Sequence, residues 1–420
     1  MTRPAVKRPA TSRSAPSAPA ASSIGPDRSG ATRFEQRSSV DFHSIADRLS
    51  AWFAENAREL PWRKLPLGSP RDPYACLVSE LMLQQTQVSR VIDRFSAFMA
   101  RFPTADDLAR AAEADVLAMW SGLGYYRRAR HLHNLAKAVV DRFDSVTPTD
   151  FDDLRSLPGV GRYTAGAVAS MSSGQRVGAV DANAIRVFLR LLGSDADPKL
   201  AQTQQMLADY GDDLARAADH AGIINEAVME LGATVCTPAR GKGASATSPS
   251  PNCAACPISA HCAAFEENKQ REIPLVVVTA SARKTKPRTE KRELHIAAAI
   301  IMDAKGRVLM RQRAAGASHT TSMWAGMYEL PAVETLDTKP SKAALAKELG
   351  IASNLLVLRE TIQHETTHRA VTARVYQCDH IPRDWKPSSG WLNPVWVNTR
   401  KLETLGLSSL HRKMAEMGLA

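Results

Sequence analysis

Between residues 157 and 165 the chain reads Leu157-Pro158-Gly159-Val160-Gly161-Arg162-Tyr163-Thr164-Ala165. This stretch lies between two segments with helical periodicity, so it predicts a turn that joins two helices. Its two glycines permit tight backbone geometry, and the start of the second helix offers backbone N–H groups without internal partners. Gly159, Val160 and Gly161 can therefore hold a phosphate group through the main chain. Because many helix corners contain glycine, the turn alone is a weak indication of a ligand.

The turn belongs to a long helical region. Apolar residues recur at helical spacing in Ile45-Leu49-Trp52-Phe53 and in Val88-Ile92-Phe95-Phe98. Breaks rich in Pro and Gly fall at 66–73, 103–104, 122–124, 147–149 and 158–161. No alternation typical of strands is sustained. Residues 41–269 are therefore predicted to form an all-α domain, which can be divided into two lobes.

The segments on either side differ in composition. Residues 1–40 are rich in Ala, Ser, Pro and Arg without periodicity, which predicts a disordered basic tail. Residues 270–293 predict a basic linker. Strand-like runs follow at 294–301, 308–311, 371–376 and 395–397, with a helix near 341–349. Residues 294–420 are therefore expected to form an α+β domain, which makes the whole chain multi-domain.

Composition narrows the possible partners. The 420 residues carry a net charge of +11 and a pI near 9.5, which suits a polyanionic partner but equally fits a merely soluble basic protein. No apolar run is long enough to span a membrane, and no segment resembles a secretory signal. The six cysteines are too sparse for a disulfide framework, so a reduced, intracellular location is expected.

Four of the six cysteines form the pattern C-x16-C-x2-C-x5-C at Cys236, Cys253, Cys256 and Cys262. Four thiolates at such short spacing bind a tetrahedral zinc ion or an iron–sulfur cluster, and spacing does not choose between them. The loop between the first two cysteines holds Arg240, which a bound metal group would present to phosphates. A plain solvated insertion is the alternative. Cys76 and Cys378 have apolar surroundings typical of core residues.

Two carboxylates attract attention, although each has a simple structural explanation. Glu80 lies in the mostly apolar stretch Ser79–Gln87, where burial would raise its pKa and let it act as an acid near neutral pH. A surface position on an amphipathic helix is the alternative. Asp181 follows the glycine turn and the apolar helix after it. On its own it is as well explained by a helix N-cap.

Taken together, these motifs resemble the helix-hairpin-helix DNA glycosylases of the endonuclease III superfamily, and among them the MutY-type adenine glycosylases. The resemblance covers about residues 45–265 and, more weakly, about 294–415. The segments that carry it, besides the four cysteines, are Leu60–Arg63, Ser79–Gln87, Gly122–Tyr126, Leu157–Ala165 and Val180–Asn183. It implies an enzyme of base-excision repair that flips adenine from duplex DNA and hydrolyses its bond to the sugar. The implied partner is duplex DNA with adenine opposite 8-oxoguanine or guanine. The protein would act as a monomer and be found associated with DNA in the cell.

The resemblance also implies roles for individual residues. Glu80 would protonate the adenine, and Asp181 would stabilise the sugar cation that forms as the base departs. Tyr163 and Asn183 would line the catalytic centre. Trp62 and Arg63 would lie near the adenine pocket, and Gln85 and Tyr125 would enter the base stack. The four cysteines would hold a [4Fe–4S] cluster.

Tyr163 bears on the reaction outcome. Relatives that also cut the strand carry a lysine at this place in the turn, which forms a Schiff base with the sugar. Tyrosine cannot form one. A monofunctional glycosylase that leaves an abasic site is therefore expected.

The C-terminal domain resembles a Nudix fold through Met323–Pro331, which fits the pattern W-x-G-x-x-E-x-P. The following helix has a single acidic residue, Glu348, too few to hold the metal of a Nudix hydrolase. A module that recognises 8-oxoguanine is expected instead. The segment 364–368 matches the family's recognition hairpin, with Thr367 and His368 as hydrogen-bonding residues. Thr366 replaces the family's aromatic residue, so weaker discrimination of 8-oxoguanine from guanine is expected.

The sequence departs from the family pattern at two further places, and three other functions are alternatives to that of an adenine glycosylase. Ala182 stands where the family has glycine, and the gap between the first two cysteines is longer than usual, an insertion that loop entropy tolerates. A pyrimidine glycosylase with lyase activity conflicts with Tyr163 and with the second domain. A DNA-binding protein without catalysis would need neither Glu80 nor Asp181. Nudix-type hydrolysis lacks its glutamates.

Overall fold

The computed structural model describes residues 40–63, 66–239, 250–274, 292–314, 324–336, 338–366, 369–378, 385–398, 402 and 405–417. The expected N-terminal tail, most of the linker, Arg240, Thr367 and His368 lie outside the described residues. Up to residue 274 the described regular structure is helical, and from residue 292 it is a mixture of strands and helices. The expected all-α and α+β parts are thus both present. Among the described helices, none combines the length and apolar character that a membrane span requires.

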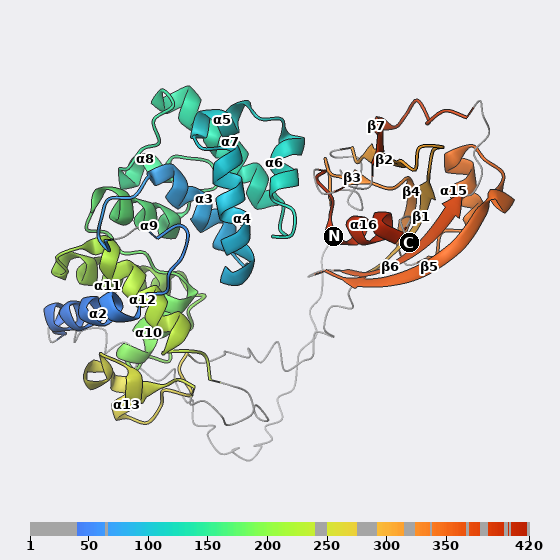
Figure 1. Ribbon diagram of the computed structural model, residues 1–420. Helices are drawn as coiled ribbons and strands as arrows, with labels where there is room; N and C mark the ends of the chain where they lie inside the picture. The colour runs from blue at the N-terminus through green and yellow to red at the C-terminus, as the bar shows by residue number, and fades with distance from the viewer. Residues whose placement is uncertain are drawn as a thin grey trace, which may run out of the picture. The chain divides into compact units, whose positions relative to one another are not determined.

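The helical part has two lobes (Figure 1). In the first, seven helices enclose a core rich in Leu, Phe, Val and Ala, which includes the fully buried Trp120. Their bounds are α3 Pro73–Leu83, α4 Val88–Arg101, α5 Ala105–Arg110, α6 Glu113–Met119, α7 Arg127–Phe143, α8 Phe151–Arg155 and α9 Arg162–Ser173. The predicted apolar positions of α4 face this core: Val88 and Ile92 pack against it, and Phe95 and Phe98 are buried in it.

The second lobe combines the first helix with later ones, so its parts are distant in sequence (Figure 1). It contains α2 Phe42–Asn56, α10 Ala182–Leu191, α11 Ala201–Ala217 and α12 Ala221–Thr234. Ile45, Leu49 and Phe53 form the buried stripe of α2, as their helical spacing predicts. The segment with the last three cysteines follows as the short elements η2 Cys253–Ala255, η3 Ser259–His261 and α13 Ala263–Glu266.

Helices α8 and α9 and the turn between them form the predicted helix-hairpin-helix. Gly159 has φ +81°, a left-handed conformation that glycine adopts without steric cost. A Cβ atom there would lie 2.9 Å from Nδ1 of His131 on α7, so the turn also packs too closely for a side chain. Gly161 is the N-cap residue of α9, and the backbone N–H of Ala165 donates to its carbonyl. The hairpin places Tyr163 in the first turn of α9.

The C-terminal part contains two sheets. The first has the order β4-β1-β6-β5, in which β1 pairs in parallel with β6 and the other two pairings are antiparallel. The second is antiparallel, with the order β3-β2-β7. Strand bounds are β1 Arg292–Ile301, β2 Val308–Gln312, β3 Tyr328–Glu329, β4 Ala332–Leu336, β5 Leu356–Glu365, β6 Arg369–Cys378 and β7 Leu392–Val397. The accompanying helices are α15 Lys342–Leu349, η4 Ser353–Leu355 and α16 Ser409–Glu416.

Strand β1 organises this part because both of its faces are buried. Leu294, Ile296, Ala298 and Ile300 enter one apolar cluster, and Ala297, Ala299 and Ile301 enter another. The even and odd positions thus separate onto opposite faces, as the period of a strand requires. The four predicted strands and the helix near 341–349 are present. β3, β4, β5 and α16 were not predicted from the sequence.

Candidate active site and cysteine centre

Glu80 lies in the last half of α3, a helix whose first turn is fixed by Asp72. The Asp72 carboxylate accepts from the backbone N–H groups of Tyr74 and Ala75, and nearly every residue from Tyr74 to Met82 is buried. Glu80 itself is only 6% exposed. Burial raises its pKa to about 7, and the negative charge of Asp181 adds to this effect, while a hydrogen bond from Tyr163 opposes it. The alternative of a surface glutamate is therefore wrong.

Tyr163 meets Glu80 from the helix-hairpin-helix. Its phenolic O–H donates to Oε2 of Glu80 at 2.6 Å and also lies 3.7 Å from the sulfur of Met229. Burial, together with the two carboxylates, holds the pKa of Tyr163 well above its usual range, so it stays a neutral donor. The turn that we expected to hold phosphate thus also delivers a side chain to Glu80.

Asp181 is the N-cap of α10, so the simple structural role is present, but it does not account for the whole side chain. Oδ1 accepts from the backbone N–H of Ala184 at 2.7 Å, and Oδ2 accepts from the side-chain amide of Asn183 at 2.8 Å. Burial raises the pKa of Asp181, and these hydrogen bonds oppose the rise. Asn183 therefore orients the carboxylate, and Ala182 fits as the first residue of the helix.

The segment before Asp181 is fixed by close packing and by a buried amide. A Cβ atom on Gly178 would come within 2.5 Å of the Gly211 carbonyl carbon, so only glycine fits there. Oδ1 of Asn225 accepts from the Ala179 N–H at 3.0 Å, and its amide donates to the Val177 carbonyl at 2.9 Å. The segment 177–180, which leads into Asp181, is therefore held in one conformation by its packing and hydrogen bonds.

Sequence reasoning missed a buried network of ion pairs near Glu80. Arg63 donates to Glu226 at 2.9 Å and to Glu230 at 3.1 Å, and Arg71 also pairs with Glu226. Arg58 completes the group through Glu230. The charge of Glu226 raises the pKa of Glu80, and that of Arg71 lowers it. Two glutamates four residues apart in the apolar helix α12 were the signal that could have revealed this network.

The residues expected at the base stack occupy unusual backbone conformations. Gln85 has φ +54° and Tyr125 has φ +46°, both left-handed without being glycine. The Tyr125 side chain is 46% exposed. Trp62, in contrast, is buried, and its ring meets the edge of Phe95 at a centroid distance of 5.7 Å. Trp62 therefore belongs to the core of the first lobe, whereas Tyr125 is largely open to solvent.

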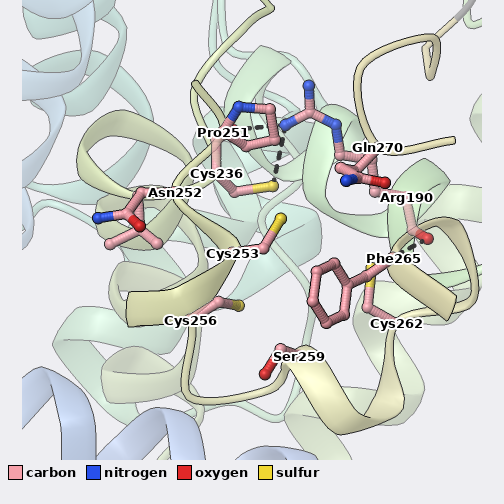
Figure 2. A pocket seen from close by; sticks show the side chains of 11 residues that line it. Arg190, Cys236, Pro251, Asn252, Cys253, Cys256, Ser259, Cys262, Phe265 and Gln270 are labelled. Carbon is pink, nitrogen blue, oxygen red and sulfur yellow. Dashed lines mark hydrogen bonds between the residues drawn. The ribbon is translucent and has the colours of Figure 1, made fainter. Parts of the chain in front are cut away.

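The four cysteines Cys236, Cys253, Cys256 and Cys262 line one small pocket (Figure 2). Burial raises the pKa of the Cys256 thiol to about 12 and that of Cys262 to about 11. Neighbouring thiols that would ionise together add to this, so four thiolates require a positive centre among them.

Helix α10 joins the cysteine centre to Asp181. Arg190 donates to the Cys236 sulfur at 3.2 Å, and its own carbonyl accepts from the Cys262 thiol at 3.4 Å. Arg186 donates to the Cys236 carbonyl at 2.8 Å and to Oδ1 of Asn183 at 2.9 Å. The helix that begins at the catalytic candidate thus ends on the cysteine segment.

In the C-terminal part, Glu329, Glu334 and Glu348 have cationic or donor partners. Glu348 accepts from Arg311 at 2.8 Å and from the Trp391 indole at 2.9 Å. Arg313 donates to both Glu329 and Glu334, so a guanidinium neutralises that acidic pair. Among the described residues, carboxylate oxygens of Glu329 and Glu334 and a ring nitrogen of His411 lie within 4.8 Å of one another, so this pair also belongs to a candidate metal-ligating group.

The expected recognition hairpin is formed by β5 and β6. Thr366 closes its tip: the Thr366 N–H donates to the Arg369 carbonyl at 2.9 Å, and Thr366 Oγ1 accepts from the Arg369 N–H at 3.0 Å. Thr367 and His368, which lie outside the described residues, are the two residues between them. Thr366 therefore takes part in the turn itself.

Comparison with known proteins gives two matching families. Residues 78–211 match the HhH-GPD superfamily of base excision DNA repair proteins, and residues 297–417 match the NUDIX domain. The chain is 40% identical over 238 residues to a mouse adenine DNA glycosylase, which covers 56% of this chain and 44% of the relative. It is 42% identical over 215 residues to an adenine DNA glycosylase of Mycolicibacterium smegmatis, which covers 51% of this chain and 67% of the relative.

The chain spans less than half the length of the mammalian relatives it matches. Among solved structures, a thermostable thymine-DNA glycosylase matches with a TM-score of 0.45 and 23% identity, covering 57% of this chain and all of that one. With the helix-hairpin-helix, the Nudix-type domain and the extent of the bacterial match, the chain belongs to the family of adenine DNA glycosylases.

Proposed function

We propose that the protein removes adenine from duplex DNA in which adenine is mispaired with 8-oxoguanine or guanine, and leaves an abasic site. The observation that carries the proposal is the buried pair of Glu80 and Tyr163 beside Asp181. It supplies an acid whose pKa lies near neutrality and, separately, a carboxylate oriented by hydrogen bonds. Removal of a base needs these two functions, and simple DNA binding needs neither.

In the proposed reaction, the protonated form of Glu80, which is well populated near neutral pH, gives its proton to a ring nitrogen of the flipped adenine. Protonation turns the base into a better leaving group, and the bond between the sugar and the base lengthens as the sugar becomes positively charged. Asp181, held by Asn183 and by the Ala184 N–H, stabilises that charge on the sugar. The bond to adenine breaks, water adds to the sugar cation, and the proton that this water loses restores protonated Glu80.

The reaction is proposed to stop at this point. A strand-cutting relative would use an amine to form a Schiff base with the sugar, but Tyr163 presents a neutral phenol that is already hydrogen-bonded to Glu80. Purified protein is therefore expected to give intact strands with abasic sites, which break only when base is added. Borohydride trapping as efficient as that of a lyase would contradict this proposal.

For the cysteine pocket we propose a [4Fe–4S] cluster held by Cys236, Cys253, Cys256 and Cys262. The gathering of the four cysteines around one pocket and the need for a positive centre among their thiolates support it. When bound, the cluster supplies the charge that keeps the thiolates ionised and cross-links the segment. Arg190 and Arg186 then hold the cysteine segment against α10 through their hydrogen bonds to Cys236.

The decisive experiment is a set of single-turnover assays on A:8-oxoguanine, A:G, A:T and thymine-glycol duplexes. We expect release of adenine from the first two. Glu80→Gln is expected to slow release by about 10²-fold or more, as for loss of a general acid. Asp181→Asn is expected to slow it by about 10²-fold, as for loss of an electrostatic stabiliser. Activity on thymine glycol alone would overturn the adenine proposal.

A further inference from the structure

Arg128, in the first turn of α7, is buried and donates to groups on three different segments. Nη1 donates to the carbonyls of Leu81 and Met82, both at 2.8 Å, and to that of Gln84. Nη2 donates to Oγ1 of Thr86 at 2.8 Å and, across the site, to the carbonyls of Leu123 at 3.1 Å and Gly124 at 3.2 Å. One guanidinium thus joins the end of α3 to two separate loops.

Each of the two loops carries one of the residues that, by the family resemblance, would enter the base stack. Gln85 lies between Gln84 and Thr86, and Tyr125 follows Gly124 directly. Both have left-handed backbone conformations, which non-glycine residues adopt only when their surroundings enforce it. The acceptors that Arg128 binds are the immediate neighbours of Gln85 and Tyr125. The guanidinium also lies 5.6 Å from the centroid of the Tyr125 ring.

Thr86 strengthens the connection between the loops. Its hydroxyl accepts from Arg128 and lies 3.3 Å from the Leu123 carbonyl of the other loop. Arg128 and Thr86 therefore make a hydrogen-bonded bridge that spans both loops. Only the flat, forked guanidinium can reach so many acceptors at once, and the ammonium of lysine cannot.

The bridge is costly to bury. Loss of hydration lowers the pKa of Arg128 to about 10, and among the described residues its Nε has no hydrogen-bond partner. No carboxylate pairs with it in the described part of the chain; its acceptors are carbonyls and a hydroxyl. An apolar side chain would avoid this cost but could not satisfy the carbonyls at the end of α3 or connect the loops.

We propose that Arg128 is a positioning residue that holds Gln85 and Tyr125 as a preformed pair, ready to fill the space that a flipped adenine vacates. The inference rests on the proposed function, since it concerns how the adenine is extracted. Because the two side chains are already ordered before DNA binds, the entropy cost of ordering them does not add to the free energy of flipping the adenine. Arg128 then matters most where the adenine must be extracted from a stacked pair.

The test compares two substrates that differ in the cost of extraction. In one, adenine is paired with guanine; in the other, adenine lies opposite an abasic site and is easier to unstack. Arg128→Lys keeps the positive charge and loses the fork. We expect single-turnover release from A:G to fall by about tenfold or more, because extraction dominates there, while release from the unpaired adenine falls much less. The matched control is Arg127→Lys, an exposed neighbour whose guanidinium contacts His131, with both rates unchanged.

Two further variants keep the inference falsifiable if Arg128→Lys folds poorly. Thr86→Val removes the hydroxyl of the bridge and should shift the ratio of the two rates in the same direction, by a smaller factor. In a Tyr125→Ala background, Arg128→Lys should change the ratio little, since its target is gone. Equal loss on both substrates, or full additivity with Tyr125→Ala, would overturn the positioning role. Wild-type protein without adenine release would overturn the proposed function instead, and the inference with it.

Discussion

At the scale of single residues, Glu80 depends on charges that lie outside its own helix. Its pKa is raised to about 7 by burial and by the charges of Asp181 and Glu226, and lowered by the Tyr163 hydrogen bond and by Arg71. Because Glu80 is proposed to act in its protonated form, the rate of base release should fall as pH rises through this pKa. This fall is the alkaline limb of the pH–rate profile, and two substitutions should move it along the pH axis in opposite directions.

Glu226→Gln removes a negative charge and leaves the positive charge of Arg71 less compensated. Both changes favour ionised Glu80, so its pKa falls and the alkaline limb of the single-turnover rate moves to lower pH. The measurement is the rate of adenine release on A:G duplex between pH 5 and 9. An unchanged limb with a uniformly lower rate would show that Glu226 acts on binding alone.

Tyr163→Phe should have the opposite effect. It removes the O–H that donates to Glu80 and stabilises its ionised form. The pKa of Glu80 should therefore rise, and the alkaline limb should move to higher pH. The same titration serves as the measurement, and the two variants control for each other because both remove a contact near Glu80. A shift of both limbs in one direction would contradict this electrostatic account.

At the scale of elements, the segment before α10 illustrates what the sequence could not show. The turn at 157–165, the apolar stripes of α2 and α4 and the spacing of the cysteines are local patterns, so they were predictable. The placement of Asn225 against Val177 and Ala179 joins residues almost fifty positions apart, and no local pattern marks it. Strand β5 was missed because it is mostly exposed and polar, so its alternation is weak.

Asn225 offers a test of how this segment is held. Asn225→Ala leaves the buried Ala179 N–H and Val177 carbonyl without partners, which should lower the free energy of unfolding by about 1–3 kcal/mol. Because Asp181 follows two residues later, the chemical step should also slow, with little change in DNA affinity. Urea denaturation and single-turnover kinetics measure the two effects. Asn134→Ala, on the exposed face of α7, should change neither.

The β5–β6 hairpin carries the proposed recognition of 8-oxoguanine. Thr367→Ala and His368→Ala should each reduce the preference for A:8-oxoguanine over A:G, since each removes a side-chain group that we propose hydrogen-bonds the damaged base. The measurement is the ratio of single-turnover rates on the two duplexes. Thr372→Ala, within strand β6, is the control. An unchanged ratio in both tip variants would remove this role.

At the scale of the whole molecule, the cysteine centre supports the lobe that contains α10. Cys256→Ser should reduce bound iron from about four atoms per chain and weaken the visible absorption of iron–sulfur thiolates. It should also lower the free energy of unfolding, because a bound metal group stabilises only the folded state. Cys76→Ser, at a buried cysteine outside the centre, should leave the iron content unchanged. Stoichiometric zinc with no iron in the wild-type protein would contradict the cluster.

Helix α10 has a consequence for how such a protein fails. Its first residue follows Asp181, and Arg186 and Arg190 further along it grip the cysteine segment. Damage at the cysteines would therefore reach the carboxylate through one rigid rod of ten residues. We therefore expect a chain that lacks the proposed cluster to lose the proposed base release as well, because the cysteine segment holds the helix that begins after Asp181. Loss of the proposed cluster would then remove base release itself and not only a structural group.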